Sequence, residues 1–342
     1  MTIRASVARK NSGYLIVLWF LSVHFAAIAQ NQIPMISISG EAQGTTYHIK
    51  YFDKQNRNFK EQVDSILNDF DKSLSLYRQD SELSEFNRSH AVKFRSAYFY
   101  PVLKKSKEVF DKTNGAFDPT IMPLVEAYGF GPLKNKNPEY LNIDSLLKLV
   151  GFNQIRFDLV MVQKLNENVK LDFNGIAQGY SVDLISRFLE QQGMERYMVE
   201  IGGEIVCKGK KESNKPWITG IENPLKPGLL YATVALTDKA MTTAGNYRNH
   251  FEKEGQIFNH LINPKTGSME QTPLLSVTVF AKDAITADGY DTAFFVMGFN
   301  ETKNFIKNHK ELDVYMIYND EQGQLKSYAS EGIRNFIKNE IN

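Results

Sequence analysis

Strand-like and helix-like patterns follow one another irregularly along this chain. Apolar and polar positions alternate in residues 36–52, with a break at Gly44, and alternate more strictly in residues 275–281, as expected for strands of a half-buried sheet. Residues 59–76 instead place apolar side chains at the spacing of an amphipathic helix. A doubly wound parallel sheet needs strict alternation of strands and helices. The observed order therefore predicts an α+β fold with packed helices and mixed or antiparallel sheets.

Further elements follow from the same two periodicities. A helix is expected over residues 176–192, capped by Asn174 and ended by Gly193, and another over 284–297, ended by Gly298. The other expected elements are a helix at 101–111, short strands within 155–171, and strands at 197–201, 204–207, 230–236, 257–262 and 314–318.

The N-terminal segment, residues 1–29, differs from the rest of the chain. It carries basic side chains and no acid, followed by an apolar run of about 16 residues that ends in Ala27-Ile28-Ala29. This pattern predicts a secretory signal peptide cleaved after Ala29, and a periplasmic location. The alternative is an uncleaved anchor in the inner membrane, although the run falls short of the roughly 20 residues of a bilayer span. No Pro- or Ser-rich linker splits residues 30–342, which are predicted to form one domain.

The amino-acid composition excludes several classes of protein. Lys and Arg total 40 and Asp and Glu total 39, which gives a formal net charge of +1, whereas a nucleic-acid-binding protein usually has a basic excess. Hydrophobic residues make up 42% of the chain, an ordinary share for a folded protein and too high for a disordered one. Because Cys207 is the single cysteine, neither an intrachain disulfide nor a thiolate cluster can form.

Several short stretches are dense in Gly, Asp, Thr and His, the residues that form turns and polar sites. They are 43–47, 75–87, 115–120, 172–183, 201–204, 242–248 with 260–267, and 287–293. Taken alone, most of these stretches are explained equally well as turns or β-bulges.

The stretch 172–183 places a strand end, a glycine turn and a helix start in sequence. Unpaired N–H groups at the start of such a helix attract phosphate. The stretch lacks both the GKS/T ending of a Walker A loop and the GxGxxG pattern of a dinucleotide-binding fold. An ordinary strand-to-helix turn is the alternative.

Three side chains in the other stretches are candidates for ligand contact. Tyr77 has a ring that could stack on a planar group, or it is half-buried at a helix end. Asp118, with the backbone amides of its Asp-Pro turn, could bind a polar heterocycle or could only form the turn. His260 ends a predicted strand, where it could act as a general base or contact phosphate, although a lone histidine usually does neither.

Asp288, Asp291 and Thr292 stand at positions i, i+3 and i+4 of a predicted helix and so share one face. Their carboxylate and hydroxyl oxygens suit a hard cation such as Mg²⁺, and Mn²⁺ is suited by the same ligands. The helix is otherwise apolar, and two buried acids need compensation, which favours a metal. The alternative is a solvated helix start whose acids are stabilised by the helix dipole.

Together the stretches carry a set of motifs in one order along residues 40–298. The motifs are GTTY, S-x-Y-x-x-x-S-E-L, GAFDP, D-x-x-G-I-A-x-G-Y, IGGEI, TTAGNYR, H-x-I-N-P-x-TG and ADGYDTA. This set resembles the ApbE family of flavin transferases. The resemblance implies a single T-fold-like domain that uses FAD and Mg²⁺ to attach FMN through a phosphoester to Ser or Thr of an acceptor flavoprotein. Family members are typically exported or membrane-anchored, and some hydrolyse FAD to FMN and AMP.

Carried over residue by residue, the resemblance implies specific roles. The implied flavin site comprises Gln43, Ala116, Phe117, Asp118, Asp172, Gln178 and the backbone near Ile262, with Tyr77 as the candidate for ring stacking. The implied metal ligands are the Gly175 carbonyl, Asp288, Asp291 and Thr292, and the implied catalytic residue is His260. Family members often have Met at the position of Gln43, which would make that contact polar here. Many have Lys at the position of Gln178, so a positive charge near the phosphates is missing.

The resemblance favours transfer of FMN from FAD to a protein hydroxyl, with FAD and an acceptor flavoprotein as partners. The alternatives are a periplasmic FAD pyrophosphatase that uses the same site, and a flavin-binding or storage protein without turnover. The acid pair and His260 favour an enzyme over a storage protein.

Overall fold

The computed structural model describes residues 33–132, 142–246, 250–253, 256–259, 261–269 and 272–340. Its largest sheet has eight strands in the order β1-β2-β6-β7-β10-β13-β14-β15, and every neighbouring pair is antiparallel. The bounds of these strands are β1 Met35–Ala42, β2 Thr45–Phe52, β6 Tyr197–Ile201, β7 Glu204–Lys208, β10 Lys239–Gly245, β13 Leu274–Ala281, β14 Asp313–Asn319 and β15 Leu325–Ala329.

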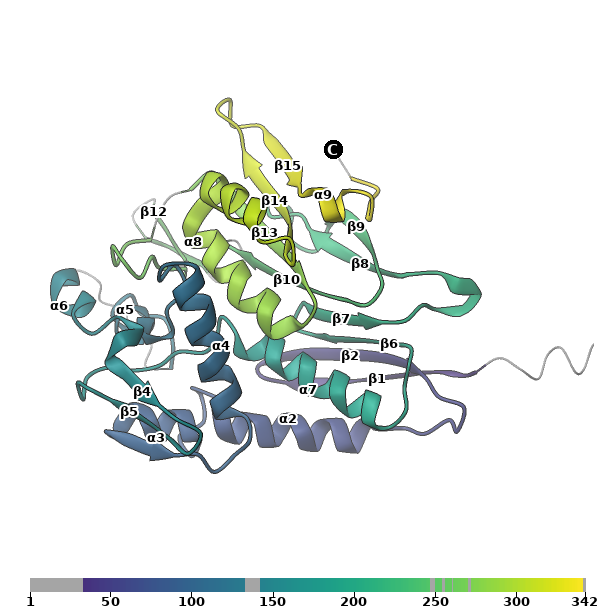
Figure 1. Ribbon diagram of the computed structural model, residues 1–342. Helices are drawn as coiled ribbons and strands as arrows, with labels where there is room; N and C mark the ends of the chain where they lie inside the picture. The colour runs from purple at the N-terminus through teal and green to yellow at the C-terminus, as the bar shows by residue number, and fades with distance from the viewer. Residues whose placement is uncertain are drawn as a thin grey trace, which may run out of the picture.

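Three smaller sheets and a set of helices complete the described structure (Figure 1). The smaller sheets are β3 Ala91–Lys93 with β5 Met161–Lys164 and β4 Ile155–Phe157; β16 Ile337–Lys338 with β9 Leu230–Leu236 and β8 Trp217–Glu222; and β11 His250–Lys253 with β12 Gln256–Asn259. The α-helices are α2 Lys60–Leu74, α3 Glu82–Arg88, α4 Phe99–Lys112, α5 Met122–Ala127, α6 Ile143–Leu147, α7 Ala177–Gln191, α8 Ala284–Asn308 and α9 Glu331–Arg334. The 3₁₀ helices are η1 Pro119–Ile121, η3 Phe152–Gln154 and η4 Glu212–Asn214.

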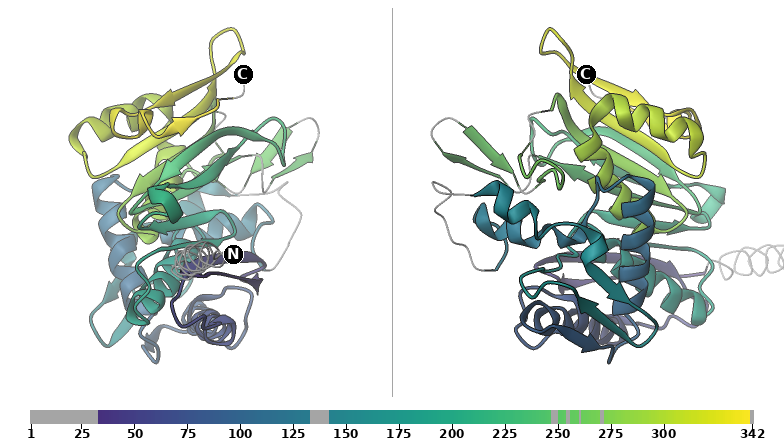
Figure 2. Two further views of the ribbon diagram at one scale, coloured as in Figure 1. Left: turned by 90° about the vertical axis from the view of Figure 1, so that its right-hand side faces the viewer. Right: turned by 60° about the vertical axis from the view of Figure 1, so that its left-hand side comes forward.

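The large sheet is covered on both faces, because its strands alternate between two cores. On one face, Val277 and Val279 of β13 belong to the larger core, which packs against α7 and α8. On the other face, Phe280 of the same strand joins Trp217 of β8 and Val234 of β9 in a second core. The views in Figures 1 and 2 show α4, α7 and α8 gathered on one side of the sheet. Side chains of alternating direction on one strand thus hold a helical layer and a small sheet on opposite faces.

The expected α+β fold is confirmed, and the described sheets are antiparallel throughout. Gly44 does not form a bulge within one strand. Gln43 and Gly44 lie in the turn between β1 and β2, and both have positive φ. Gly202 and Gly203 similarly form the turn between β6 and β7. The glycine positions were informative because only a residue without a Cβ adopts this conformation at little cost.

One local expectation was wrong. Asn174 does not cap α7: the N-cap position is Ile176, and its side chain makes no capping bond. The short strands expected within 155–171 are β4 and β5, the second of which ends at Lys164. The helix expected at 284–297 is confirmed: Gly298 has φ +75, and its non-helical backbone separates residues 284–297 of α8 from the part of the helix that follows. The predicted signal peptide and part of the predicted strand at 257–262 lie outside the described residues.

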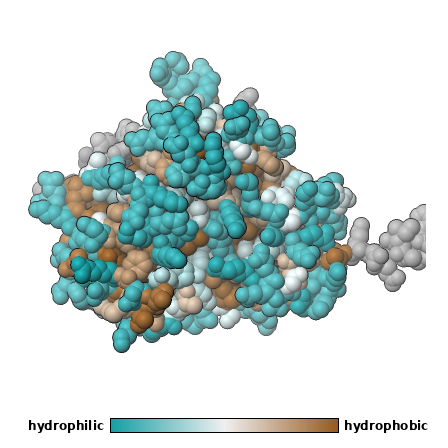
Figure 3. Space-filling model, in the orientation of Figure 1, coloured by the Kyte–Doolittle hydropathy of each residue, from teal (hydrophilic) through white to brown (hydrophobic). Residues whose placement is uncertain are grey.

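Most of the face shown in Figure 3 is hydrophilic, with apolar residues in small separate patches. The most exposed large apolar side chain is Leu159, at 76%, in the turn between β4 and β5. Among the described residues, no helix combines the length and the apolar character that a membrane crossing requires.

Candidate functional site

The predicted site residues converge on the segment that leads into α7. Asp172 N–H donates to the carbonyl of Pro119 (2.7 Å), which places the 172–175 turn beside the GAFDP stretch. Asp172 Oδ1 in turn accepts from Asn174 N–H (2.8 Å), and this local bond shapes the turn before the helix. Two stretches that are far apart in the sequence therefore meet at one place, as a shared site requires.

Asp118 and Asp172 are both almost fully buried. Asp118 Oδ1 accepts from the N–H (2.9 Å) and the hydroxyl (2.6 Å) of Thr120, and so caps η1. Burial raises the pKa of Asp118 to about 6 and the pKa of Asp172 to about 6, because both carboxylates lose water without gaining a cationic partner. Hydrogen-bond donors on a ligand would stabilise the ionised form of both groups.

Residues of the predicted flavin site and of the predicted metal site meet at Gly175. A Cβ on Gly175 would lie 2.8 Å from Thr292 Oγ1 of α8 and 3.4 Å from the ring of Phe117. The backbone at this position can thus approach both groups only because it has no side chain. Ala116 and Phe117 are buried and have apolar side chains. The polar groups where Gly175 meets Phe117 and Thr292 are therefore the Gly175 backbone and the Thr292 hydroxyl.

The two acids of α8 are buried next to this junction. Asp288 is 5% exposed and Asp291 is 2% exposed. Asp288 Oδ2 accepts from the N–H of Gly179 in α7 (2.7 Å), while Asp291 lies near the Thr242 hydroxyl and the Glu204 carboxylate. Burial raises the pKa of both Asp288 and Asp291, and a neighbouring carboxylate adds to each rise: Asp183 at Asp288, and Asp288 at Asp291. A pair of desolvated acids on one helix face is electrostatically unfavourable until a cation neutralises it.

The donor set fits a hard divalent cation. It combines two carboxylates with the Thr292 hydroxyl and the neighbouring backbone of Gly175, all oxygen donors of the type that Mg²⁺ and Mn²⁺ prefer. In the part of the chain that the structure describes, no three His, Cys, Asp or Glu side chains gather into a metal-binding group. A site here would therefore depend on neutral oxygens as well as on acids.

Gln178 is in the first turn of α7, and Gln43 lies beside the first turns of this helix. Gln178 Nε2 donates to the carbonyl of Ile201 (2.9 Å), which ties α7 to the turn between β6 and β7. Gln43 Oε1 accepts from the hydroxyl of Ser181 (3.1 Å), and the backbone of Gln43 has φ +56 in the turn between β1 and β2. Both amides are thus held by the protein at the end of the sheet next to α7.

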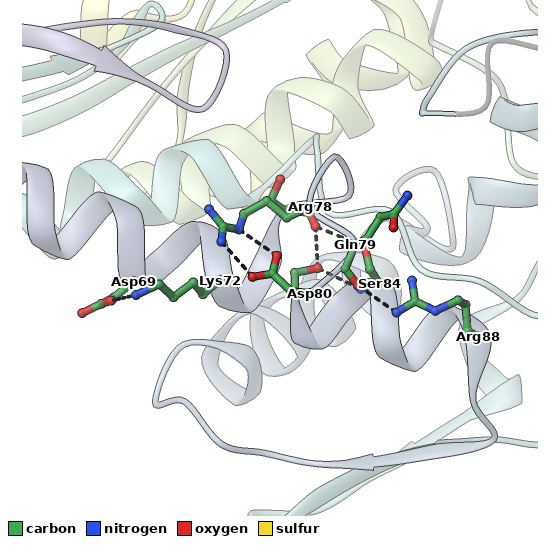
Figure 4. Close-up of polar contacts among 9 residues, drawn as sticks. Asp69, Lys72, Arg78, Gln79, Asp80, Ser84 and Arg88 are labelled. Atoms are coloured by element: carbon green, nitrogen blue, oxygen red, sulfur yellow. Dashed lines mark hydrogen bonds and ion pairs between the residues drawn. The ribbon is translucent and has the colours of Figure 1, made fainter.

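Tyr77 lies on a tightly bonded loop between α2 and α3. Ser81 Oγ donates to the Ser75 carbonyl (2.6 Å) and closes the loop. Figure 4 shows Arg78 paired with Asp80 through two hydrogen bonds, and Arg88 reaching the Gln79 carbonyl.

The ring of Tyr77 is 67% exposed, although its hydroxyl contacts the side chain of Asn174. The expectation of a half-buried tyrosine is therefore wrong. The structure presents an exposed aromatic ring next to the 172–175 turn, where it can stack on a planar group.

The roles of two predicted residues stay untested by the geometry of this place. Ile262 is buried in the larger core, to which Ala116 and Phe117 also belong, and a flavin contact of the backbone near it stays a prediction. His260 lies outside the described residues, so its role stays a prediction.

The N–H groups at the start of α7 are already used by the protein to a large extent. Ile176 and Ala177 both donate to the Phe173 carbonyl, and Gly179 donates to Asp288. The expectation that this helix start offers a row of unpaired donors to phosphate is therefore wrong for these three groups. The positive end of the helix dipole still points to the junction.

Four residues that contact or lie near the candidate residues were given no role in the site from the sequence. They are Asn174, Ser181, Glu204 and Thr242. All four are within the stretches singled out from the sequence, but only the fold brings them beside the candidate residues.

Comparisons with known proteins agree with the arrangement. Residues 43–316 match the sequence profile of the ApbE family. An FAD:protein FMN transferase from Haemophilus influenzae is 37% identical over 335 aligned residues and covers 93% of this chain and 96% of that protein. An FAD:protein FMN transferase from Vibrio cholerae is 34% identical and covers 88% of this chain and 92% of that protein.

Two solved structures have the same fold. The flavin transferase ApbE from Vibrio cholerae superposes with a TM-score of 0.78 at 32% identity, over 89% of this chain and 99% of that one. The apo form of the flavinyl transferase ApbE from Pseudomonas stutzeri superposes with a TM-score of 0.80 at 29% identity, over 90% and 98% of the two chains.

Proposed function

The chain belongs to the ApbE family, and on that basis we propose that it transfers FMN from FAD to a Ser or Thr hydroxyl of an acceptor flavoprotein and releases AMP. The observation that carries the proposal is the junction at Gly175. There the backbone lies against Phe117 of the implied flavin site and Thr292 of the implied metal site. The bond that breaks in FAD is in the pyrophosphate, between the flavin half and the adenosine half, so the two sites must adjoin.

The flavin half would be bound by the residues around the 172–175 turn. Tyr77 offers an exposed ring for stacking, and Asp118 and Asp172 offer buried carboxylates that accept hydrogen bonds from ring N–H or ribityl hydroxyl groups. Gln43 and Gln178, held beside and within the first turns of α7, supply polar side chains where the family resemblance implies Met and Lys.

A Mg²⁺ ion would be held by Asp288, Asp291, Thr292 and the Gly175 carbonyl. When bound, it neutralises charge on the pyrophosphate and on the departing phosphate. Mn²⁺ suits the same oxygen ligands. The support for this assignment is the burial of both acids together with the proximity of Gly175 to Thr292.

The reaction balances without a further reactant. The hydroxyl oxygen of the acceptor forms a bond to the phosphorus of the FMN half, and the bond from that phosphorus to the AMP oxygen breaks. His260 would accept the hydroxyl proton, a role worth about 10²–10⁴-fold in rate where it applies. AMP leaves with the electron pair of the broken bond, and the acceptor keeps FMN as a phosphoester.

We also propose that the protein works in the periplasm. The support is the basic, apolar and Ala-x-Ala pattern of residues 1–29, which predicts export, and the acceptor would then be a periplasmic flavoprotein domain or one that faces the periplasm. If the segment is not cleaved, the same pattern would anchor the protein to the inner membrane.

One experiment tests the proposed reaction against its alternatives. The mature protein is incubated with FAD, Mg²⁺ and a periplasmic flavoprotein domain, and AMP release is followed together with flavin fluorescence of the acceptor on a denaturing gel. AMP with a fluorescent acceptor supports transfer. AMP with free FMN indicates a pyrophosphatase, and the absence of both products indicates a storage protein.

The matched controls are two variants. An acceptor whose target Ser or Thr is replaced by Ala is expected to stay unlabelled. His260→Ala is expected to bind FAD with nearly parental affinity and to label the acceptor much more slowly, because a proton acceptor acts mainly in the transition state.

A further inference from the structure

Helices α7 and α8 exchange hydrogen bonds: a carboxylate of each helix accepts from backbone N–H groups at the N-terminal end of the other helix. Asp183 of α7 accepts from the N–H groups of Ala284 (2.8 Å, Oδ1) and Ile285 (2.9 Å, Oδ2) at the start of α8. Asp288 of α8 accepts from the N–H of Gly179 (2.7 Å) at the start of α7. In each helix, the donating N–H groups are three or four residues before the carboxylate, so donors and carboxylate lie on the same face. The exchange is reciprocal: each helix caps the other.

The exchange is buried and closely fitted. Asp183 is 7% exposed and Asp288 is 5% exposed. A Cβ on Gly179 would lie 2.3 Å from the Ala284 carbonyl oxygen and 2.7 Å from Asp288 Cβ, so the two helices touch here through their backbones. Because no side chain separates the two backbones at this contact, one helix has little room to slide past the other.

We infer that Asp183 is a positioning residue for the metal site: by fixing the start of α8 against α7, it sets where Asp288, Asp291 and Thr292 stand relative to Gly175. This inference rests on the proposed function, because it concerns the metal site of that reaction. Asp183 itself has no place in the ligand set and acts through the helix that carries the ligands. Its two acceptor oxygens hold two adjacent N–H groups, which fixes both the distance and the rotation of α8.

Residues on α7 and on α8 contribute to the same junction, which is why their register matters. Gly175 is in the turn just before α7, and Thr292 lies in the third turn of α8. Loss of the Asp183 bonds would leave the Gly179–Asp288 bond as the remaining half of the exchange. The start of α8 could then rotate or shift, and a shift of ligand oxygens of the order of 1 Å weakens a metal site strongly.

The test compares two acids at the same helix end. Asp183→Asn removes the charge and one of the two acceptor oxygens. The matched control is Asp283→Asn, which removes a charge at the neighbouring position but keeps the local cap of α8, where Asp283 accepts from Thr286 N–H (3.1 Å). Asp183→Ser, which is smaller and uncharged, serves as a second variant if Asp183→Asn does not fold. Circular dichroism checks the folding of each protein.

Two readouts are measured at pH 8. Mn²⁺ binding is followed by calorimetric titration without FAD, and hydrogen exchange is followed in the peptide that contains Gly179. We expect Asp183→Asn to raise the Mn²⁺ dissociation constant by about tenfold, the size of effect seen when a partner that orients a metal ligand is removed. We also expect faster exchange at Gly179, because the Asp288 bond loosens. Asp283→Asn is expected to change neither readout.

The outcomes separate this inference from the proposed function. If Asp183→Asn binds Mn²⁺ like the parent and Gly179 stays protected, Asp183 does not position the site, and the inference is overturned while the metal site stands. An equal loss of Mn²⁺ affinity in Asp283→Asn also overturns it, because the effect would then be one of charge alone. A parent protein that binds no Mn²⁺ contradicts the metal site of the proposed function, and the inference falls with it.

Discussion

Four of the buried carboxylates of the site region are each held by a different group. Asp118 accepts from Thr120, Asp172 from the Asn174 backbone, Asp183 from the start of α8, and Asp288 from the start of α7. A substitution at each position should therefore have its own effect on ligand binding. Single substitutions can therefore distinguish these roles.

Asp172→Asn should weaken FAD binding by about tenfold or more and leave Mn²⁺ binding nearly unchanged, because a hydrogen bond to a charged group contributes roughly 1.5–3 kcal/mol. The matched control is Asp158→Asn. Asp158 accepts from the N–H two residues ahead, as Asp172 does, but it lies in the exposed turn of β4 and β5. Fluorescence titration with FAD measures the difference. Equal affinity in the Asp172 variant and the parent would remove Asp172 from the flavin site.

Gly175→Ala tests the junction directly. Its φ is not in the left-handed region, so the expected effect is steric: the new methyl would crowd Thr292 Oγ1, 2.8 Å away, and Phe117. FAD and Mn²⁺ affinities should both fall. In the double variant Gly175→Ala/Thr292→Ala the crowding by Thr292 is removed, so FAD affinity should recover while Mn²⁺ affinity stays low. Recovery of both affinities, or of neither, would count against the proposed junction.

At the scale of elements, α7 and α8 carry the groups whose protonation links the fold to pH. Burial raises the pKa of Asp183 to about 7 from its ordinary value of 3.8, although the Ala284 and Ile285 N–H groups oppose the rise. The folded protein therefore binds this proton more tightly than the unfolded chain does. The resulting contribution to stability is fully present below pH 3.8 and is lost as pH rises through about 7.

In thermal unfolding without metal, the parent should lose stability relative to Asp183→Asn as pH rises from 5 to 7, by of the order of 2 kcal/mol. The reason is that the variant has no proton to release at this position. The measurement is the melting temperature of both proteins over this pH range. Parallel curves for the two proteins would show that Asp183 does not titrate in this way.

Much of the element order could be predicted because it follows from side-chain periodicity. The strand expected at 230–236 coincides with β9, and the one at 275–281 lies within β13. Helix α3 and strand β8 were not predicted. Trp217 and Ile221 of β8 pack in the second core, which distant residues such as Phe52 and Tyr315 complete. Asn174 was expected to cap α7 from its position alone, but its side chain instead contacts Tyr77.

The candidate site could be predicted only in part, for a related reason. The face shared by Asp288, Asp291 and Thr292 follows from helical spacing, and the structure buries both acids on that face. The bonds from Asp183 to α8 join residues 101 and 102 positions apart, so no local pattern contains them. The motif resemblance pointed to the stretch that includes Asp183 but gave it no role.

At the scale of the whole molecule, residues 1–29 are predicted to be removed on export, so the mature protein should begin at Gln30. The physical reason is the small side chains of Ala27 and Ala29 after an apolar run that is short for a bilayer span. N-terminal sequencing of protein recovered from the periplasm measures this. A periplasmic or membrane-bound protein that still begins at Met1 would contradict cleavage.

The central claim is that the acid face of α8 binds the metal that FMN transfer needs. Asp288→Asn is the sharpest variant, because an amide oxygen can still accept from Gly179 N–H while the negative charge is lost. AMP release and acceptor-bound FMN are measured together against Mg²⁺ concentration, with circular dichroism as the folding control. For the parent, the account predicts that both products rise with Mg²⁺ in equal amounts. For the folded variant, it predicts that neither rises. A folded Asp288→Asn protein with the Mg²⁺ dependence of the parent would contradict the account.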